Sequence, residues 1–232
     1  MGSDPTPSNS RATREGWGQT PTETPTAARV GGWLFAHRTS LPVPLAVAIL
    51  AIPSTQTRAV TATILGGLAL TLTGELVRLL AVRHIGVISR TRSERLGPLI
   101  DTGPFALVRN PLYLGNIALW TGFALTARLL WLAPIVIVAL GAVYHAIVRW
   151  EEGLLDARVG EAYRDYSMRV PRWLPKNFRL QTSNVRLEPS DLRPETSRLR
   201  LVFSWRDTLF SERGTLLAMA AGYVLLWLKA RF

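Results

Sequence analysis

The stretch D-T-G-P-F-A-L-V-R-N-P-L-Y-L-G-N, residues 101–116, joins a polar corner to an apolar helix. Gly103 and the proline after it predict a turn, because glycine adopts positive φ readily and proline breaks a preceding helix. Arg109 supplies a cation, and Asn110 precedes a second proline, which is typical of a first helical turn. Tyr113 is the first ring of the apolar run that follows. The stretch therefore predicts a polar cluster at the start of an apolar helix.

Long apolar segments on both sides of this corner predict a membrane fold. They are 40–57, 59–82, 112–127, 129–148 and 214–228. The first is interrupted by prolines and is shorter than the ~20 residues that a straight span requires, and the last is a possible fifth span. None alternates with the period of a strand. We therefore expect an all-α polytopic membrane bundle of about five transmembrane helices.

A second polar segment lies one helical hairpin further along the chain. The apolar segments 112–127 and 129–148 are separated by Arg128 alone, which predicts an antiparallel pair. The second of them is expected to end at Glu151 and Glu152. Both polar segments then emerge on the same side of the membrane, and one polar site is expected from two distant stretches.

The basic composition follows the expected loops. The chain has 232 residues, a formal charge of +11 and 48% hydrophobic residues. Connections rich in Lys and Arg alternate with poor ones, as the positive-inside rule gives for five spans with a cytoplasmic N-terminus. The charge is thus explained without nucleic acid, and no basic patch interleaved with aromatic residues is present. We expect a bacterial inner-membrane protein whose polar site faces the cytoplasm.

Composition also limits the chemistry. The chain has no cysteine, which excludes disulfides, thiolate metal sites and a cysteine nucleophile, and its three histidines lie far apart. Neither a metal nor a nucleic acid is therefore expected as a partner. Within the 59–82 span, Glu75 and Arg78 share one helical face, so they are expected to pair and to face the bundle or a polar cavity.

Four regions are expected along the chain. Residues 1–29 are rich in Ser, Thr, Pro and Gly and read as a disordered tail. Residues 30–175 hold the membrane core. Residues 176–211 are polar and read as a cytoplasmic linker, and residues 212–232 as a C-terminal transmembrane helix.

Three segments together resemble the superfamily of isoprenylcysteine carboxyl methyltransferases and phospholipid methyltransferases. They are G-P-F-A-L-V-R-N-P-L-Y-L-G at 103–115, W-E-E at 150–152 and G-E-A-Y-R-D-Y-S-M-R-V-P-R-W-L-P at 160–175. Such enzymes are integral to the membrane and use S-adenosylmethionine. The resemblance implies methyl transfer to a lipophilic acceptor, either a lipid amine or an isoprenylcysteine-like carboxylate, with membrane lipids as the other partners. Phe105 and Asn110 stand where the family usually has Tyr and His, and Asn110 cannot act as an acid or base.

The resemblance also implies the residues that bind the cofactor. These are Gly103, Phe105, Arg109, Asn110, Pro111, Tyr113, Gly115, Glu151 and Glu152. The chemistry of S-adenosylmethionine suits such a set, because Arg109 can bind its carboxylate and Tyr113 can contact the adenosyl part. Glu151 or Glu152 can accept from its ammonium or ribose. No G-x-G-x-x-G sequence is present, so the Rossmann mode of binding is not available.

The catalytic candidates depend on the acceptor. Methyl transfer is an in-line displacement, which requires alignment of the nucleophile, the methyl group and the sulfur. Glu152 can act as a base or electrostatic partner for an amine acceptor. Arg169 or Arg172 can position a carboxylate acceptor, which needs no base.

Two other classes remain open from the sequence. The NADPH-dependent membrane sterol reductases resemble the same region, but they carry Arg-Asp where this chain has Glu151 and Glu152, and cysteines that this chain lacks. A non-catalytic membrane scaffold would keep the fold without binding S-adenosylmethionine.

Overall fold

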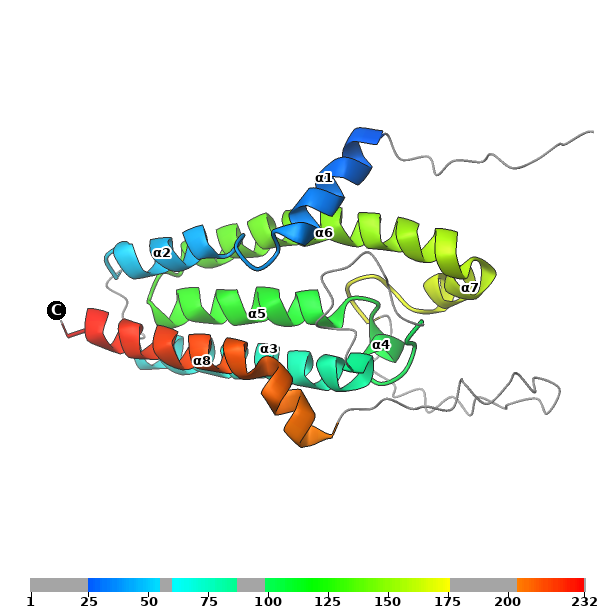
Figure 1. Cartoon of the computed structure of the whole chain (residues 1–232). Coiled ribbons are helices and arrows are strands. Elements are labelled where there is room, and N and C mark those ends of the chain that lie inside the picture. Colours follow the sequence, from blue (N-terminus) through cyan, green and yellow to red (C-terminus); the bar gives the residue numbers. More distant parts are fainter. Residues whose placement is uncertain (1–24, 55–59, 87–98, 176–203, 232) are drawn as a thin grey trace, which may run out of the picture.

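The described part of the chain is helical (Figure 1). A computed structural model describes residues 25–54, 60–86, 99–175 and 204–231, and these contain no strand. The helices are α1 Pro25–Ala36, α2 Val43–Ala51, α3 Val60–Ile85, α4 Pro104–Leu107, α5 Pro111–Thr126, α6 Leu132–Val159, α7 Glu161–Arg169 and α8 Trp205–Lys229. The predicted all-α membrane class is confirmed.

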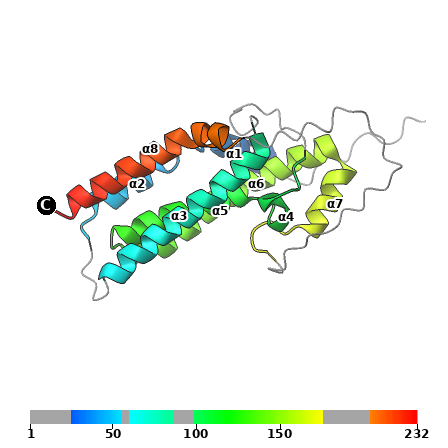
Figure 2. The same cartoon turned by 90° about the horizontal axis from the view of Figure 1, so that it is seen from below.

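Three of the described helices, α3, α6 and α8, are long and apolar enough to cross a membrane. The predicted spans at 112–127 and 40–57 are shorter in the structure. Helix α5 has 16 residues and α2 has 9. At 1.5 Å per residue α5 is about 24 Å long, which is less than the ~30 Å of a hydrocarbon core. Helix α5 nevertheless runs alongside α3 and α6 (Figures 1 and 2).

The long helices form two layers. Helices α3, α5 and α6 lie together, and α2 and α8 lie side by side over them (Figure 2). Glycines allow α3 and α5 to approach closely. A Cβ atom added to Gly74 would lie 2.6 Å from the carbonyl oxygen of Gly115, and one added to Gly67 would lie 2.7 Å from that of Gly122. Small residues at such positions let helix backbones touch, which favours association in a membrane.

The hairpin between α5 and α6 forms as predicted. Arg128 adopts a positive φ of 61°, which reverses the chain, and the N–H group of Leu129 donates to the carbonyl of Ala124 at 2.9 Å. Helices α5 and α6 then run side by side in opposite directions (Figure 1).

Helix α6 continues beyond the end that we predicted. We expected the helix to stop at Glu151 and Glu152, but it extends to Val159 and ends at Gly160, whose φ is 63°. Most residues in this last part, G-L-L-D-A-R-V, are good helix formers, and the glycine at the end adopts positive φ without strain. Both carboxylates therefore project from the body of a rigid helix.

The outer segments begin earlier than the regions we predicted. Helix α1 starts within the expected tail 1–29 and crosses α6, where Gly31 and Gly32 pack on the Trp150 side chain. Helix α8 starts within the expected linker 176–211, and the Ser204 hydroxyl caps it by accepting from the N–H of Asp207. The rest of the predicted tail and linker, at 1–24 and 176–203, lies outside the described residues.

Candidate functional site

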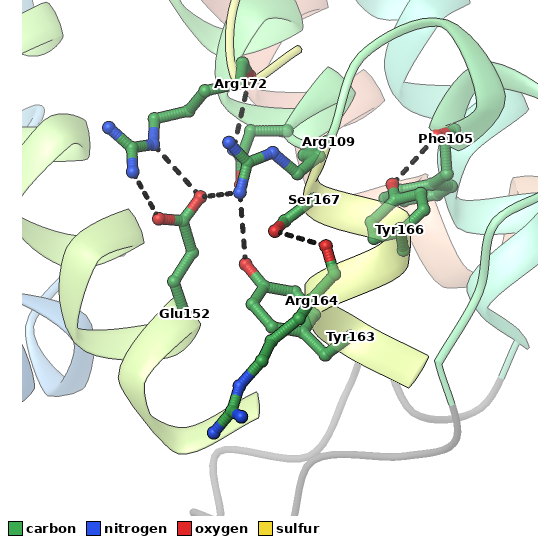
Figure 3. A network of polar contacts seen from close by, with 9 residues as sticks. Phe105, Arg109, Glu152, Tyr163, Arg164, Tyr166, Ser167 and Arg172 are labelled. Atoms are coloured by element: carbon green, nitrogen blue, oxygen red, sulfur yellow. Dashed lines mark hydrogen bonds and ion pairs between the residues drawn. The ribbon is translucent and has the colours of Figure 1, made fainter. Parts of the chain in front are cut away.

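One carboxylate joins the two polar segments (Figure 3). Glu152 Oε1 lies 2.8 Å from Arg109 Nη1 and accepts from Arg172 Nε at 3.0 Å. Arg109 Nη1 also donates to the Tyr163 hydroxyl at 3.3 Å. The side chains of Arg109 and Glu152 are only 14% and 15% exposed, so their pairing is partly shielded from solvent. The network links the corner before α5 to α6, α7 and the segment after α7.

Backbone contacts hold the corner in place. Val108 is extended, with φ of −144° and ψ of 147°, so the chain leaves α4 in a straight link. The N–H group of Arg109 donates to the carbonyl of Pro171 at 2.9 Å, and Asn110 Nδ2 donates to that of Arg172 at 3.2 Å. The segment after α7 is thereby fixed against the start of α5. The Asn110 side chain contributes a structural hydrogen bond and, as an amide, does not act as an acid or base.

A second contact ties α5 to α6 next to the first. The Tyr113 hydroxyl donates to Glu151 Oε2 at 3.0 Å. The ring of Tyr113 stacks on that of Tyr144, with centroids 4.7 Å apart. The two glutamates thus have different neighbours, because Glu152 contacts guanidinium groups and Glu151 a phenol.

The pair predicted within α3 is present and reaches further than expected. Arg78 Nε donates to Glu75 Oε2 at 3.1 Å, which confirms the predicted pairing. The same guanidinium also donates to Asn116 on α5 and to Glu212 on α8. It donates to Thr215 Oγ1 at 3.2 Å. The arginine therefore joins three helices.

A cavity of about 1090 Å³ lies between the two layers of helices. One end is polar and is lined by Arg109, Glu151 and Glu152, among others. From there the lining continues to the apolar side chains of Leu119 and Phe123, further along α5. A single cavity therefore joins the charged cluster, formed by Arg109, Glu152 and Arg172, to the interior of the bundle.

Most of the predicted cofactor residues line this cavity. They are Phe105, Arg109, Asn110, Pro111, Tyr113, Glu151 and Glu152. The two glycines are not among the lining residues. A Cβ atom on Gly103 would clash with the ring of His84 at 2.3 Å, and one on Gly115 would lie 2.7 Å from Arg78 Cγ. Each glycine permits close packing, so its place in the motif has a structural reason.

The two predicted catalytic arginines differ in position. Arg172 binds Glu152 and so belongs to the charged cluster, although it does not line the cavity. Arg169 is exposed on α7 and donates from Nε to the carbonyl of Asp165 at 3.4 Å. The structure does not bring Arg169 to the other predicted residues.

Several polar residues that line the cavity were not predicted from the sequence. They are Arg38, Asn116, Tyr144, Glu212 and Thr215. Helical spacing was an available signal for two of them. Tyr144 lies two turns before Glu151, and Asn116 one turn after Tyr113, each on a shared helical face. Arg38 and Glu212 lie far from the motif in sequence and had no such signal.

Burial keeps the two tyrosines of α7 neutral. Burial, assisted by the charge of Glu152, raises the pKa of Tyr163 to about 12. Burial also raises the pKa of Tyr166, whose hydroxyl donates to the carbonyl of Phe105 at 2.8 Å (Figure 3). Hydrogen bonding to Glu152 raises the pKa of Arg172. At neutral pH the phenols are therefore hydrogen-bonding groups and Arg172 is a permanent cation.

Among the residues that the structure describes, no group of three or more His, Cys, Asp or Glu side chains is placed to hold a metal ion.

Comparison with known proteins identifies relatives of the central part of the chain. A nickel-cobalt-cadmium resistance protein, NccN, from Alcaligenes xylosoxydans xylosoxydans is 33% identical over 78 residues, which are 34% of this chain and 36% of the relative. A cobalt-zinc-cadmium resistance protein, CzcN, from Cupriavidus metallidurans is 28% identical over 78 residues with the same shares. The match thus spans about a third of each relative. No solved structure matches the chain.

Residues 62–162 match the phospholipid methyltransferase family. The matched segment holds Arg109, Tyr113, Glu151 and Glu152, which form the polar end of the cavity. The resemblance seen in the sequence is thus confirmed, because this part of the chain matches a family within the isoprenylcysteine and phospholipid methyltransferase superfamily.

Proposed function

We propose that this membrane protein transfers a methyl group from S-adenosylmethionine to a lipophilic acceptor. The family match supports a membrane methyltransferase in general. The observation that carries the finer proposal is the single cavity, which has Arg109 and Glu152 at one end and apolar side chains of the bundle further along. A charged cofactor needs polar and charged groups around it, and an apolar acceptor needs an apolar pocket next to them.

The residues at the polar end suit the cofactor. Arg109 Nε is buried and has no hydrogen-bond partner among the described residues, so it can donate to the cofactor's carboxylate. Glu151 accepts one hydrogen bond from Tyr113, and a carboxylate can accept several more, from an ammonium or a ribose hydroxyl. The stacked rings of Tyr113 and Tyr144 supply an aromatic wall. When bound, S-adenosylmethionine supplies an electrophilic methyl group.

Glu152 serves mainly to position its neighbours. Both of its oxygens accept from guanidinium groups, and these bonds hold Arg109 and Arg172 at fixed places beside the cavity. Preorganised charges of this kind align reactants without reorganisation during the reaction. For an amine acceptor, Glu151 and Glu152 are the carboxylates available at this end of the cavity. For a carboxylate acceptor, the cation available beside Glu152 is Arg172.

We propose that this polar end faces the cytoplasm, the compartment that supplies soluble S-adenosylmethionine. The alternation of Lys and Arg between connections supports this orientation. The acceptor then enters from the surrounding leaflet with its tail still in an apolar medium. Transfer of each methylene group to water costs about 0.8 kcal/mol, so a route through water is unfavourable for a long tail.

Labelled methyl transfer tests this function. The protein in lipid nanodiscs is incubated with S-adenosylmethionine that carries an isotopic methyl group, and the extracted lipids are analysed by mass spectrometry. We expect label in a lipid with the wild type and the Arg164→Ala control, whose arginine is exposed and binds Asp156, but not with Arg109→Ala. Mild alkali releases the label from a methyl ester and not from an N-methyl group. Unlabelled lipid despite bound cofactor would contradict the proposal.

The names of the two relatives support a second role, in tolerance of divalent metals. Those relatives are named as resistance proteins for nickel, cobalt, zinc and cadmium. We propose that lipid methylation by this chain contributes to such tolerance. A deletion strain is grown with each metal after complementation with the wild type or Arg109→Ala. Equal rescue by both would separate metal tolerance from methyl transfer.

A further inference from the structure

The apolar part of the cavity is walled in part by helices outside the family-matched segment. Residues 62–162 contain α5 and α6 whole and all of α3 except its first two residues, but neither α2 nor α8. Ile49 of α2 and Met219 of α8 nevertheless line the same cavity as Phe123 of α5 (Figure 2 shows the two layers). The family motif therefore supplies the polar end, while this chain's own outer helices complete the apolar part.

Polar contacts near both ends and in the middle fix helix α8 against α3 and α2. Glu212 near its start binds Arg78 of α3. The Tyr223 hydroxyl donates to Thr71 Oγ1, also on α3, at 2.8 Å. Near its end, Lys229 Nζ donates to the carbonyl of Ile49 at 2.7 Å and so holds the C-terminal end of α2. The helix is therefore a fixed wall of the cavity.

Between the first two contacts, small residues of α8 face the cavity and leave it open. They are Gly214, Ala218, Ala221 and Gly222. Gly222 lies close to the opposite wall, because a Cβ atom added there would lie 2.9 Å from Phe123 Cε1. The Phe123 ring is itself held by Tyr223, with centroids 4.7 Å apart. A larger side chain at Gly222 must therefore occupy the cavity or displace this ring.

The distance along the bundle fits a tail from one leaflet. Tyr113 at the polar end and Phe123 are separated by about 15 Å along α5, from the helical rise of 1.5 Å per residue. This is about half of the ~30 Å hydrocarbon thickness of a bilayer. With the polar end at the membrane boundary, as proposed above, the apolar part of the cavity would reach to about the middle of the bilayer.

We propose that α8 and α2 wall a pocket for the hydrocarbon tail of the methyl acceptor, and that Gly222 opposite Phe123 sets the tail length that the pocket admits. This inference rests on the proposed methyltransferase function. The occupant is the acceptor's own tail, because the pocket is continuous with the site where its nucleophile must meet the cofactor.

A pair of opposite substitutions tests the pocket. The values of kcat/KM are measured for acceptors that share one headgroup and differ in tail length. We expect Gly222→Leu to lower the ratio of long-tail to short-tail kcat/KM by at least tenfold, and Phe123→Ala to shift the preferred length upward. Ala220→Leu is the matched control, since Ala220 is exposed on α8 and does not line the cavity.

The outcomes separate this inference from the proposed function. If the wild type is active but Gly222→Leu and Phe123→Ala both keep its preference for tail length, the pocket is overturned and the proposed function stands. A length shift in Ala220→Leu equal to that in Gly222→Leu would also overturn the pocket. A wild type that binds S-adenosylmethionine but methylates no acceptor of any length would overturn both proposals.

Discussion

Arg109 and Glu152 form an ion pair of 2.8 Å across the whole α5–α6 hairpin, since one residue precedes α5 and the other lies in the last part of α6. Arg172 binds the same carboxylate from the segment after α7. Three separate parts of the chain thus meet at one charged group. The cluster can form only when the hairpin is closed, so assembly of the site is coupled to folding of the bundle.

Substitution of the pair should weaken cofactor binding. We expect Arg109→Ala to lower S-adenosylmethionine affinity more than tenfold, about 1.4 kcal/mol or more, because the cofactor's carboxylate loses its cation. Glu152→Gln should lower it by a similar factor, because Arg109 and Arg172 lose the charge that positions them. Calorimetry on folded variants measures both effects. Unchanged affinity in either variant would remove that residue from the binding site.

Tyr113→Phe should have a smaller effect. The change removes the hydroxyl that donates to Glu151 but keeps the ring that stacks on Tyr144. This hydrogen bond lies within the protein and acts on the cofactor only by positioning Glu151, so we expect an affinity loss of less than about tenfold, or about 1.4 kcal/mol. Tyr113→Leu also removes the stacked ring and should lose more. A larger loss in the Phe variant than in Arg109→Ala would assign the main recognition to the phenol.

Topology can be read from single cysteines, because the natural chain has none. Leu130 lies in the turn between α5 and α6, and Ala162 lies on α7, and both are exposed. An impermeant thiol reagent should label the Leu130→Cys variant in intact cells and the Ala162→Cys variant only after permeabilisation. The reverse pattern would place the polar end of the cavity outside the cytoplasm.

Close packing of α3 on α5 should depend on one of two adjacent glycines. A Cβ atom on Gly67 would lie 2.6 Å from the backbone nitrogen of Thr126, whereas one on Gly66 meets nothing within 4 Å. We expect Gly67→Ala to destabilise the protein by about 1 to 3 kcal/mol through overpacking. Gly66→Ala should be neutral or stabilise it by up to about 1 kcal/mol. Thermal unfolding in detergent compares the two, and equal midpoints would argue against this helix contact.

Alkaline pH should destabilise the contact between α7 and the charged cluster. Burial raises the pKa of Tyr163 from 10 to about 12, so the folded state holds the phenolic proton more tightly than the unfolded state. The stabilising contribution is complete below pH 10 and is lost as the pH rises from 10 to 12. We expect the unfolding midpoint to fall over this range and the fall to be smaller in Tyr163→Phe. An identical pH dependence in both proteins would show that Tyr163 does not titrate as inferred.

The sequence by itself determined the class of fold and the content of the motif. Runs of apolar residues longer than any ordinary strand require helices in a membrane, where every backbone group must be satisfied internally. The short connection predicted around Arg128, which spans residues 127–131 in the structure, leaves only an antiparallel arrangement of α5 and α6. Arg109, Tyr113 and Glu152 were recognisable because they lie in short segments of characteristic spacing. Each of these inferences depends on neighbours close in sequence.

Only the tertiary structure decided how the cavity is enclosed. Glu212 binds Arg78, and Gly222 faces Phe123, yet neither pair shares a local pattern that could reveal it. Such contacts depend on how whole helices pack, and packing is set by the summed shapes of many side chains. Packing also adds to the helix propensity of the end of α6, because Leu155 packs against the tyrosines of α7, a contact that the sequence pattern did not reveal.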